Sequence, residues 1–339
     1  MLLMNWYEVT RNEYSVFLQT DSESLYSIKK DIEPYYTINR VELAKDILDN
    51  SYWKLSDPSN GVITENKEIN VIRIELKVLD EPEREFFVVP QEKIIEVNKP
   101  INKKWKNQVI IRLIRDIFRN YFYSKKNMSF FHGGLITNNN LGIAFMGGKK
   151  SGKTSSILSF LKYSDMDYVT NDDISIQINN NEVIGYGWPR TISIRNDTFS
   201  SLNLNREDIA SKLRHPSNDT TWKNEATFVY PNELEQFLTT KVSSKCKVNY
   251  VIFPAFNDNI QNPVLEEVNK SKFAELLKLN IEPDINRYFR DFQKYFPFTD
   301  ENKNEEIIKD IVNNCRGFTL NQNFKNLSKS VDLVRKELM

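Results

Sequence analysis

The sequence predicts a mixed α/β (α+β) protein with a β-rich N-terminal domain, residues 1–104, and a larger domain with a mixed sheet, residues 105–339. Three observations predict this class. Short alternating runs fill the first hundred positions, and a long amphipathic pattern begins at residue 105. An apolar strand, a glycine-rich loop and a helix then follow one another directly over residues 141–163. With 339 residues, 40% of them hydrophobic, the chain is long enough to form two cores.

The N-terminal domain is predicted from strands with a period of two residues. Residues 71–78, Val-Ile-Arg-Ile-Glu-Leu-Lys-Val, alternate between apolar and polar, and residues 86–89, Phe-Phe-Val-Val, form a second run. We expect one helix, residues 41–48, among these strands. Because the domain carries no recognisable pattern of catalytic residues, we interpret it as a packing and docking layer.

Residues 105–123 predict a strongly amphipathic helix. Its apolar residues recur at spacings of three and four: Trp105, Val109, Ile110, Leu113, Ile114, Ile117, Phe118, Tyr121 and Phe122. The opposite face is basic, with Lys103, Lys104, Arg112, Arg115 and Arg119. We interpret this face as solvated, and an acidic partner is the alternative.

The next segment predicts a β-hairpin that ends at the glycine-rich loop. Residues 130–136, Phe-Phe-His-Gly-Gly-Leu-Ile, lead through a turn at 138–140 into the apolar strand 141–146. His132, one of only two histidines, lies on the first strand, close to the loop. A lone histidine is usually structural, so a catalytic role for His132 remains one of two alternatives.

Residues 147–154, Gly-Gly-Lys-Lys-Ser-Gly-Lys-Thr, fit the phosphate-binding pattern G-x-x-x-x-G-K-[ST] at every fixed position. The strand before it and the helix of residues 155–163 after it supply the context that this motif requires. Backbone N–H groups and the helix N-terminus would face the phosphates, Lys153 would reach the β- and γ-phosphates, and the Thr154 hydroxyl would bind Mg²⁺. We therefore predict a site for ATP and Mg²⁺ formed by Gly147, Gly148, Lys149, Lys150, Ser151, Gly152, Lys153, Thr154 and Ser155. The alternative is a glycine-rich turn with a surface lysine.

Two carboxylates return toward this loop. Asp172 and Asp173 follow the short apolar run 168–170 and precede the alternating run 174–178. One can hold Mg²⁺ while the other accepts a proton from an attacking hydroxyl. A second hairpin, turning at 179–181, then leads to Arg190 and Arg195, either of which could neutralise the transferred group. For the two aspartates the alternative is a turn before an edge strand, and for the two arginines it is a position on the surface.

Composition excludes several classes of function. Basic and acidic residues balance at 46 each, so we expect no nucleic acid and no membrane as partner. Cys246 and Cys315 lack the spacing of a zinc or redox site, which suits a reducing cytoplasm. We find no basic N-terminal region and no apolar run long enough to span a bilayer, so a cytoplasmic location is expected.

Two further segments leave alternatives open. Residues 213–221 are polar and could form either a lid over the phosphates or an ordinary connection. Residues 282–298 crowd aromatic side chains into a helical pattern, which indicates a buried core or a contact between copies in a homo-oligomer.

The succession of these features resembles the HPr kinase/phosphorylase-like proteins, which are related to phosphoenolpyruvate carboxykinase. The resemblance covers roughly residues 105–195: a helix, His132-Gly133, the loop, Asp172-Asp173, and a step with Gly187 and Pro189-Arg190. Weaker matches at 228–233, 248–254, 317–320 and 326–338 extend it toward the C-terminus. It implies a kinase-like core with a P-loop.

The resemblance also implies roles for single residues. Lys153 and Thr154 would hold phosphates and Mg²⁺, His132 would lie beside the catalytic acid, Asp173 would accept the proton, and Asp172 would serve the metal or orientation. The glutamate-bearing signature of HPr kinases is missing at 185–195, so the chain is more similar to members that phosphorylate a peptide serine or a natural-product hydroxyl.

We therefore predict an ATP- and Mg²⁺-dependent kinase for a hydroxyl group, with a peptide or protein serine ahead of a small molecule. A nucleotide-binding regulatory module without turnover is the alternative from another class. The intact pair Asp172-Asp173 favours the kinase. The sequence does not distinguish adenine from guanine.

Overall fold

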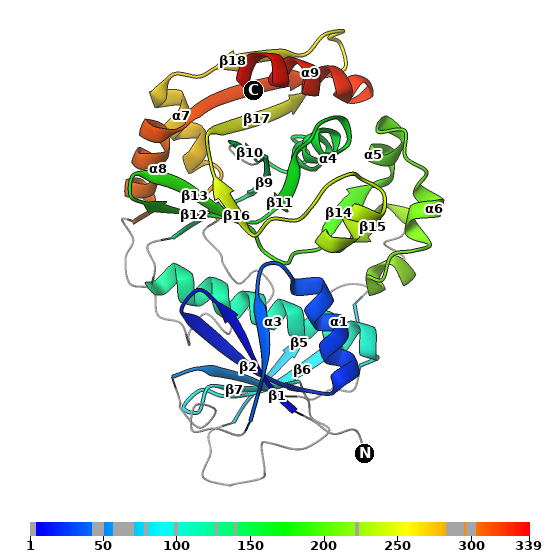
Figure 1. Cartoon of the computed structure of the whole chain (residues 1–339), viewed down its shortest axis with the longest axis vertical. Coiled ribbons are helices and arrows are strands. Elements are labelled where there is room, and N and C mark those ends of the chain that lie inside the picture. The colour runs from blue at the N-terminus through cyan, green and yellow to red at the C-terminus, as the bar shows by residue number, and fades with distance from the viewer. Residues whose placement is uncertain are drawn as a thin grey trace. The chain divides into compact units, whose positions relative to one another are not determined.

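The computed structural model describes residues 5–42, 51–56, 71–77, 81–97, 101–125, 128–138, 141–220, 224–282, 295 and 303–339. The chain divides into two compact units (Figure 1). The first comprises Met1–Tyr121 and Asp284–Pro297, and the second Phe122–Pro283 and Phe298–Met339. Both contain helices and a mixed sheet, which confirms the predicted mixed α/β class.

The first unit is built on a seven-stranded sheet with the order β3-β1-β2-β4-β7-β6-β5. Its strands are β1 (Asn5–Arg11), β2 (Tyr14–Thr20), β3 (Thr37–Val41), β4 (Trp53–Ser56), β5 (Ile72–Leu76), β6 (Arg84–Val89) and β7 (Ile94–Val97). The β2–β4 and β4–β7 pairs are parallel and the other pairs are antiparallel. Asp21 caps α1 (Ser22–Ile32) by accepting the N–H groups of Glu23 and Ser24. The helix expected at residues 41–48 lies almost wholly outside the described residues.

The amphipathic helix is α3 (Lys103–Lys125). The predicted domain boundary at residue 104 assigns it to the second domain, whereas the first compact unit includes it up to Tyr121. Its apolar face packs on that unit's sheet, since Phe118 stacks on Tyr36 at 4.8 Å and meets Tyr14 edge-on at 5.9 Å.

The prediction that the basic face of this helix is solvated is wrong for two of its residues. Arg115 and Arg119 are buried. Arg112 binds the carboxylate of Glu81 through two hydrogen bonds of 2.7 and 2.9 Å. The helical pattern does not predict this ion pair, because Glu81 lies 31 residues before Arg112 in the chain.

The second unit is built on a six-stranded sheet with the order β11-β9-β10-β17-β19-β18 (Figure 1). Its strands are β9 (Gly133–Asn138), β10 (Leu141–Met146), β11 (Asp167–Thr170), β17 (Tyr250–Phe256), β18 (Val264–Glu267) and β19 (Arg316–Gln322). β10, β17 and β19 run parallel, and β9 is antiparallel to both β10 and β11. The predicted hairpin into the loop is confirmed, with Asn138 opposite Leu141 and Gly133 opposite Met146.

Alternation along β10 divides the core of this unit into two layers. Ile143 and Phe145 pack with α4 (Lys153–Tyr163) and α9 (Leu327–Leu338) on one face. Ala144 and Met146 pack on the other face with α7 (Lys270–Lys278), α8 (Lys303–Asn314) and a second sheet. The strand before the loop is therefore buried on both faces, as its continuous apolar sequence predicts.

The second sheet has four strands in the order β16-β13-β12-β8. They are β8 (Ser129–Phe131), β12 (Ile174–Asn179), β13 (Glu182–Tyr186) and β16 (Lys245–Lys247). The predicted β12–β13 turn is confirmed: Asn180 and Asn181 take φ angles of 49° and 63°, which suit a two-residue hairpin.

The remaining elements of the second unit are short. They are β14 (Ile192–Arg195) paired with β15 (Ala226–Val229), α5 (Asn196–Ser201), α6 (Arg206–Ala210), and the 3₁₀ turns η2 (Pro216–Asp219), η4 (Pro231–Gln236) and η6 (Phe324–Asn326). Asn218 fixes residues 213–220 to β15 through two 2.8 Å hydrogen bonds with the backbone of Phe228, which favours the ordinary connection over a lid. Of the aromatics predicted at 288–296, only Tyr295 is among the described residues.

Candidate active site

The strand directions bring the sequence-predicted residues to one edge of the six-stranded sheet. β10, β11, β17 and β19 all end there, because β11 is parallel to β10 through their common antiparallel neighbour β9. The glycine-rich loop follows β10, the Asn171-Asp172-Asp173 turn follows β11, and His132 precedes β9. Ligand sites of α/β sheets typically lie at this carboxyl edge.

The loop connects β10 directly to α4, as the motif requires. Gly152 takes a φ of 103° immediately before Lys153 begins the helix, and Ser156 donates its N–H to the Gly152 carbonyl at 2.8 Å. A Cβ atom on Gly152 would lie 2.8 Å from the ring of Phe256, so the position has no room for a side chain. Gly148, Lys149 and Lys150 are exposed, and a Cβ on Gly148 would meet nothing within 4 Å. The outer side of the loop is therefore open to a ligand.

Lys153 is buried beneath this loop. Its ammonium donates hydrogen bonds to the carbonyls of Gly147 at 2.7 Å and Gly148 at 3.0 Å. Burial lowers the pKa of the Lys153 ammonium, and the charges of Asp172 and Glu282 partly offset that effect. The cation is therefore held at the loop and is only partly desolvated.

Thr154 and Ser155 point in different directions at the start of α4. The Thr154 hydroxyl donates to Oδ1 of Asn171 at 3.1 Å, which links the loop to the turn after β11. The Ser155 hydroxyl is buried and lies 3.3 Å from that of Thr198 on α5. Any contact of Ser155 with a phosphate would thus come from its backbone N–H rather than from its hydroxyl.

The two adjacent aspartates lie in different environments. Asp172 is half-buried and has a φ of 65°, and its negative charge raises the pKa of Lys153. Asp173 is 0% exposed, and its Oδ2 lies 2.8 Å from Nη1 of Arg190. Arg190 therefore forms an ion pair with Asp173, in addition to any role toward a phosphoryl group.

Glu282 is a further charged residue of the site that the sequence did not reveal. Its Oε1 lies 3.7 Å from Nδ1 of His132. The backbone holds the two together: His132 donates its N–H to Asn280 at 2.7 Å, and Glu282 donates to Phe130 at 2.9 Å. An isolated bridge between Phe131 and Ile281, which are about 150 residues apart in the chain, brings Glu282 to the site, so no local pattern could have found it.

The polar atoms at this sheet edge fit a Mg²⁺-bound nucleotide. Ser151 Oγ, Asn171 Nδ2 and Gln322 Oε1 are buried at this edge, and each lacks a hydrogen-bond partner among the described residues. In the same described part of the chain, no three His, Cys, Asp or Glu side chains are grouped to hold a metal. The Thr154 hydroxyl and the Asp172 carboxylate would hold Mg²⁺ together with phosphate oxygens and water, as is usual for this ion.

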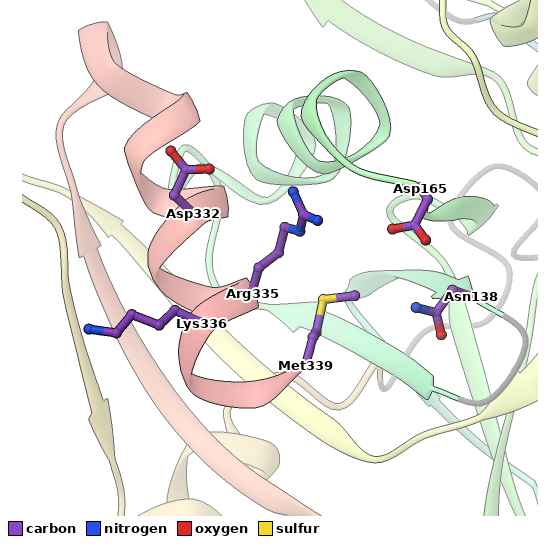
Figure 2. A pocket seen from close by; sticks show the side chains of 6 residues that line it. All are labelled: Asn138, Asp165, Asp332, Arg335, Lys336 and Met339. Atoms are coloured by element: carbon purple, nitrogen blue, oxygen red, sulfur yellow. The ribbon is translucent and has the colours of Figure 1, made fainter.

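A shallow depression of about 510 Å³ lies elsewhere on the second unit (Figure 2). Its lining residues are Asn138, Asp165, Asp332, Arg335, Lys336 and Met339. Figure 2 shows Arg335 of α9 and Met339, the residue after that helix, projecting toward Asp165 and Asn138. None of the sequence-predicted site residues lines it.

Among the helices that the structure describes, none has the length and apolarity to cross a bilayer.

Comparison with known proteins gives little. No protein-family model matches the chain, and no curated protein matches it. Among solved structures, the chain is similar to the Hpr(Ser) kinase/phosphatase from Coxiella burnetii, with 11% sequence identity and a TM-score of 0.29. That alignment covers 61% of this chain and 94% of the other. The function proposed below rests on the motif and the geometry of the site.

Proposed function

We propose that the protein is an ATP- and Mg²⁺-dependent kinase that transfers the γ-phosphoryl group to a hydroxyl, with a serine of a peptide or protein as acceptor. One observation carries this proposal: a complete phosphate-binding loop with a buried Lys153 shares one sheet edge with two carboxylates. A site that only binds a nucleotide needs the loop, whereas transfer to a hydroxyl also needs a proton acceptor.

The loop and Lys153 bind and position the phosphates. Backbone N–H groups of residues 147–152 and the N-terminus of α4 supply partial positive charge, and Lys153 supplies a full one close by. When bound, Mg²⁺ neutralises charge on the phosphates. Because Lys153 is buried, its charge acts in a medium of lower dielectric constant than water and is correspondingly more effective.

The carboxylates provide the route for the proton. The acceptor oxygen forms a bond to the γ-phosphorus, the bond from that phosphorus to the β-phosphate oxygen breaks, and ADP leaves. The hydroxyl proton passes to a carboxylate. The family resemblance assigns this role to Asp173. Asp172 is the more accessible of the two, and its charge raises the pKa of Lys153.

The test is phosphoryl transfer by purified protein with labelled ATP, Mg²⁺ and serine peptides. Lys153→Ala should lower transfer by orders of magnitude at saturating ATP, with a smaller loss of nucleotide affinity because the backbone of the loop remains. Lys272→Ala is the matched control, since this lysine is exposed on α7 and pairs with Glu275. Wild-type turnover by Lys153→Ala would contradict the assignment of the loop.

The variants Asp172→Asn and Asp173→Asn identify the proton acceptor. Each keeps the shape of the side chain and removes its basicity, so the acceptor variant should bind ATP and lose nearly all transfer. If both variants transfer phosphate at the unmodified rate, neither aspartate is the base.

One observation favours a second function, a nucleotide-binding regulatory module without turnover. Asp173 is fully buried and paired with Arg190, which would suit a structural role. This alternative predicts tight ATP binding and no transfer to a peptide serine or to a small-molecule hydroxyl. Assaying both acceptor classes with the unmodified protein separates it from the kinase.

A further inference from the structure

Asn171 links the phosphate-binding loop to the turn that carries both aspartates. Asn171 directly follows β11 and is 1% exposed, and its Oδ1 accepts the hydrogen bond from the Thr154 hydroxyl at 3.1 Å. The other half of the same amide, Nδ2, is buried and has no hydrogen-bond partner among the residues that the structure describes. A buried donor without a partner costs free energy, so it points to a ligand that supplies an acceptor.

The position of this amide is fixed by the backbone around it. β11 pairs with β9, and a Cβ atom on Gly134 would lie 3.2 Å from the Asn171 Cα, so only glycine leaves room for this approach. The oxygen and nitrogen of one amide are roughly 2.3 Å apart by covalent geometry. Nδ2 therefore lies no more than about 5.4 Å from the oxygen of the Thr154 hydroxyl.

We propose that Asn171 binds the nucleotide directly: Oδ1 orients the Thr154 hydroxyl, and Nδ2 donates a hydrogen bond to a phosphoryl oxygen. This inference rests on the proposed function, since it requires that the loop binds a nucleotide. A hydroxyl that offers its oxygen to a cation must direct its hydrogen elsewhere, and Oδ1 of Asn171 is the acceptor placed for it.

The residue type at position 171 fits this role. The turn already holds two carboxylates, and a third would repel the phosphates that the loop attracts. An amide has the shape of a carboxylate but is neutral and carries N–H donors, so it can approach an anion. Asn171 is then a positioning residue for Thr154 and a ligand of the phosphates.

A double-mutant cycle of Asn171→Ala and Thr154→Ala separates the two halves of the amide. ATP affinity is measured by isothermal titration calorimetry, with Mg²⁺ and with EDTA. If Nδ2 donates to the nucleotide, Asn171→Ala should weaken ATP binding roughly tenfold to a hundredfold in the unmodified chain, and again in the Thr154→Ala chain. The loss should persist in EDTA, because a hydrogen bond to a phosphoryl oxygen does not need the metal.

Asn249→Ala is the matched control. The Asn249 side chain accepts the N–H of Gly142 at 3.1 Å, at the end of β10 away from the loop, so its loss should lower stability and leave ATP affinity unchanged. Urea unfolding of every variant checks that it folds. Asn171→Ser replaces the alanine variant if that one does not fold, since its shorter side chain cannot reach both groups.

Two results overturn the inference. If Asn171→Ala has no further effect in the Thr154→Ala chain, Asn171 acts only by orienting Thr154. If Asn171→Ala binds ATP like the unmodified protein, Asn171 has no role in binding. Failure of the proposed function looks different, because the unmodified protein would then either bind no ATP or bind ATP without transferring phosphate to any hydroxyl.

Discussion

The ion pair between Asp173 and Arg190 gives the sharpest stability prediction for the second unit. Arg190→Met removes the guanidinium and leaves the Asp173 carboxylate, which is 0% exposed, without its 2.8 Å partner. Two unit charges at that distance attract by about 6 kcal/mol at an effective dielectric constant of 20. Removing one member of a buried pair typically costs about 3–5 kcal/mol. Because the Arg190 side chain is 19% exposed, we expect the lower end, about 3 kcal/mol.

Two further variants isolate the charge effect. Arg190→Met with Asp173→Asn removes both charges of the pair and should recover at least half of the lost stability, since removing both partners is far less costly than removing one. Arg195→Met is the matched control: its guanidinium is 64% exposed and 3.6 Å from Asp197, so its loss should cost less than about 0.5 kcal/mol.

Urea unfolding combined with hydrogen exchange measures these differences. Exchange of peptides from β12 and β13 reports the opening of the four-stranded sheet, whose strand β12 begins one residue after Asp173. A loss of about 3 kcal/mol corresponds to more than a hundredfold faster exchange. Two results would contradict this reasoning: Arg190→Met costs no more stability than Arg195→Met, or the double variant loses the sum of the two single losses. In either case Arg190 does not stabilise the buried carboxylate of Asp173.

Three further predictions follow from individual contacts. Burial raises the pKa of the Cys315 thiol to about 12 from its ordinary 9.0. Above pH 9 the thiol therefore loses its proton in the unfolded chain but not in the folded one, and the stability of the fold falls as pH rises. Urea unfolding at pH 8 and pH 10 should show that Cys315→Ala removes about 1.3 kcal/mol of this loss of stability. Gly134→Ala should lower stability by about 1–3 kcal/mol in thermal unfolding, because its Cβ would lie 2.7 Å from the carbonyl of Thr170. His132→Ala should lower phosphoryl transfer roughly tenfold to a hundredfold and leave ATP affinity unchanged; equal transfer would make His132 structural.

Local patterns predicted the elements that carry the loop. The hairpin of β9 and β10, the loop and α4 occur where the apolar runs and the glycines indicate, since each depends on residues close together in the chain. The long helix is also correct in extent, α3 covering Lys103–Lys125 against the expected 105–123. These segments have strong periodicity, which is the most reliable signal that a single sequence offers.

Contacts between distant segments could not be predicted in the same way. Glu282 reaches His132 through an isolated bridge, and Arg190 reaches Asp173 after the chain has formed a complete hairpin. The role of Asn171 depends on which strand lies beside β9, a question of topology rather than of local pattern. Local sequence therefore predicts which residues lie near the loop, but it does not predict how their side chains pair.

The turn after β11 explains why two neighbouring aspartates can differ in role. It carries the chain from the six-stranded sheet into the four-stranded one, and it does so with Asp172 at a φ of 65°. On either side of that peptide the environments differ: the Asp173 carboxylate is buried against Arg190, whereas Asp172 is half-buried and its charge raises the pKa of Lys153. Glycine adopts such a φ without cost, and aspartate adopts it more readily than most residues but at some cost in stability. A side chain kept in a costly conformation at a candidate site is a reason to look for its chemistry there. Environment, not residue type, then separates the two carboxylates, as it does wherever a pair of acids divides the work of proton transfer.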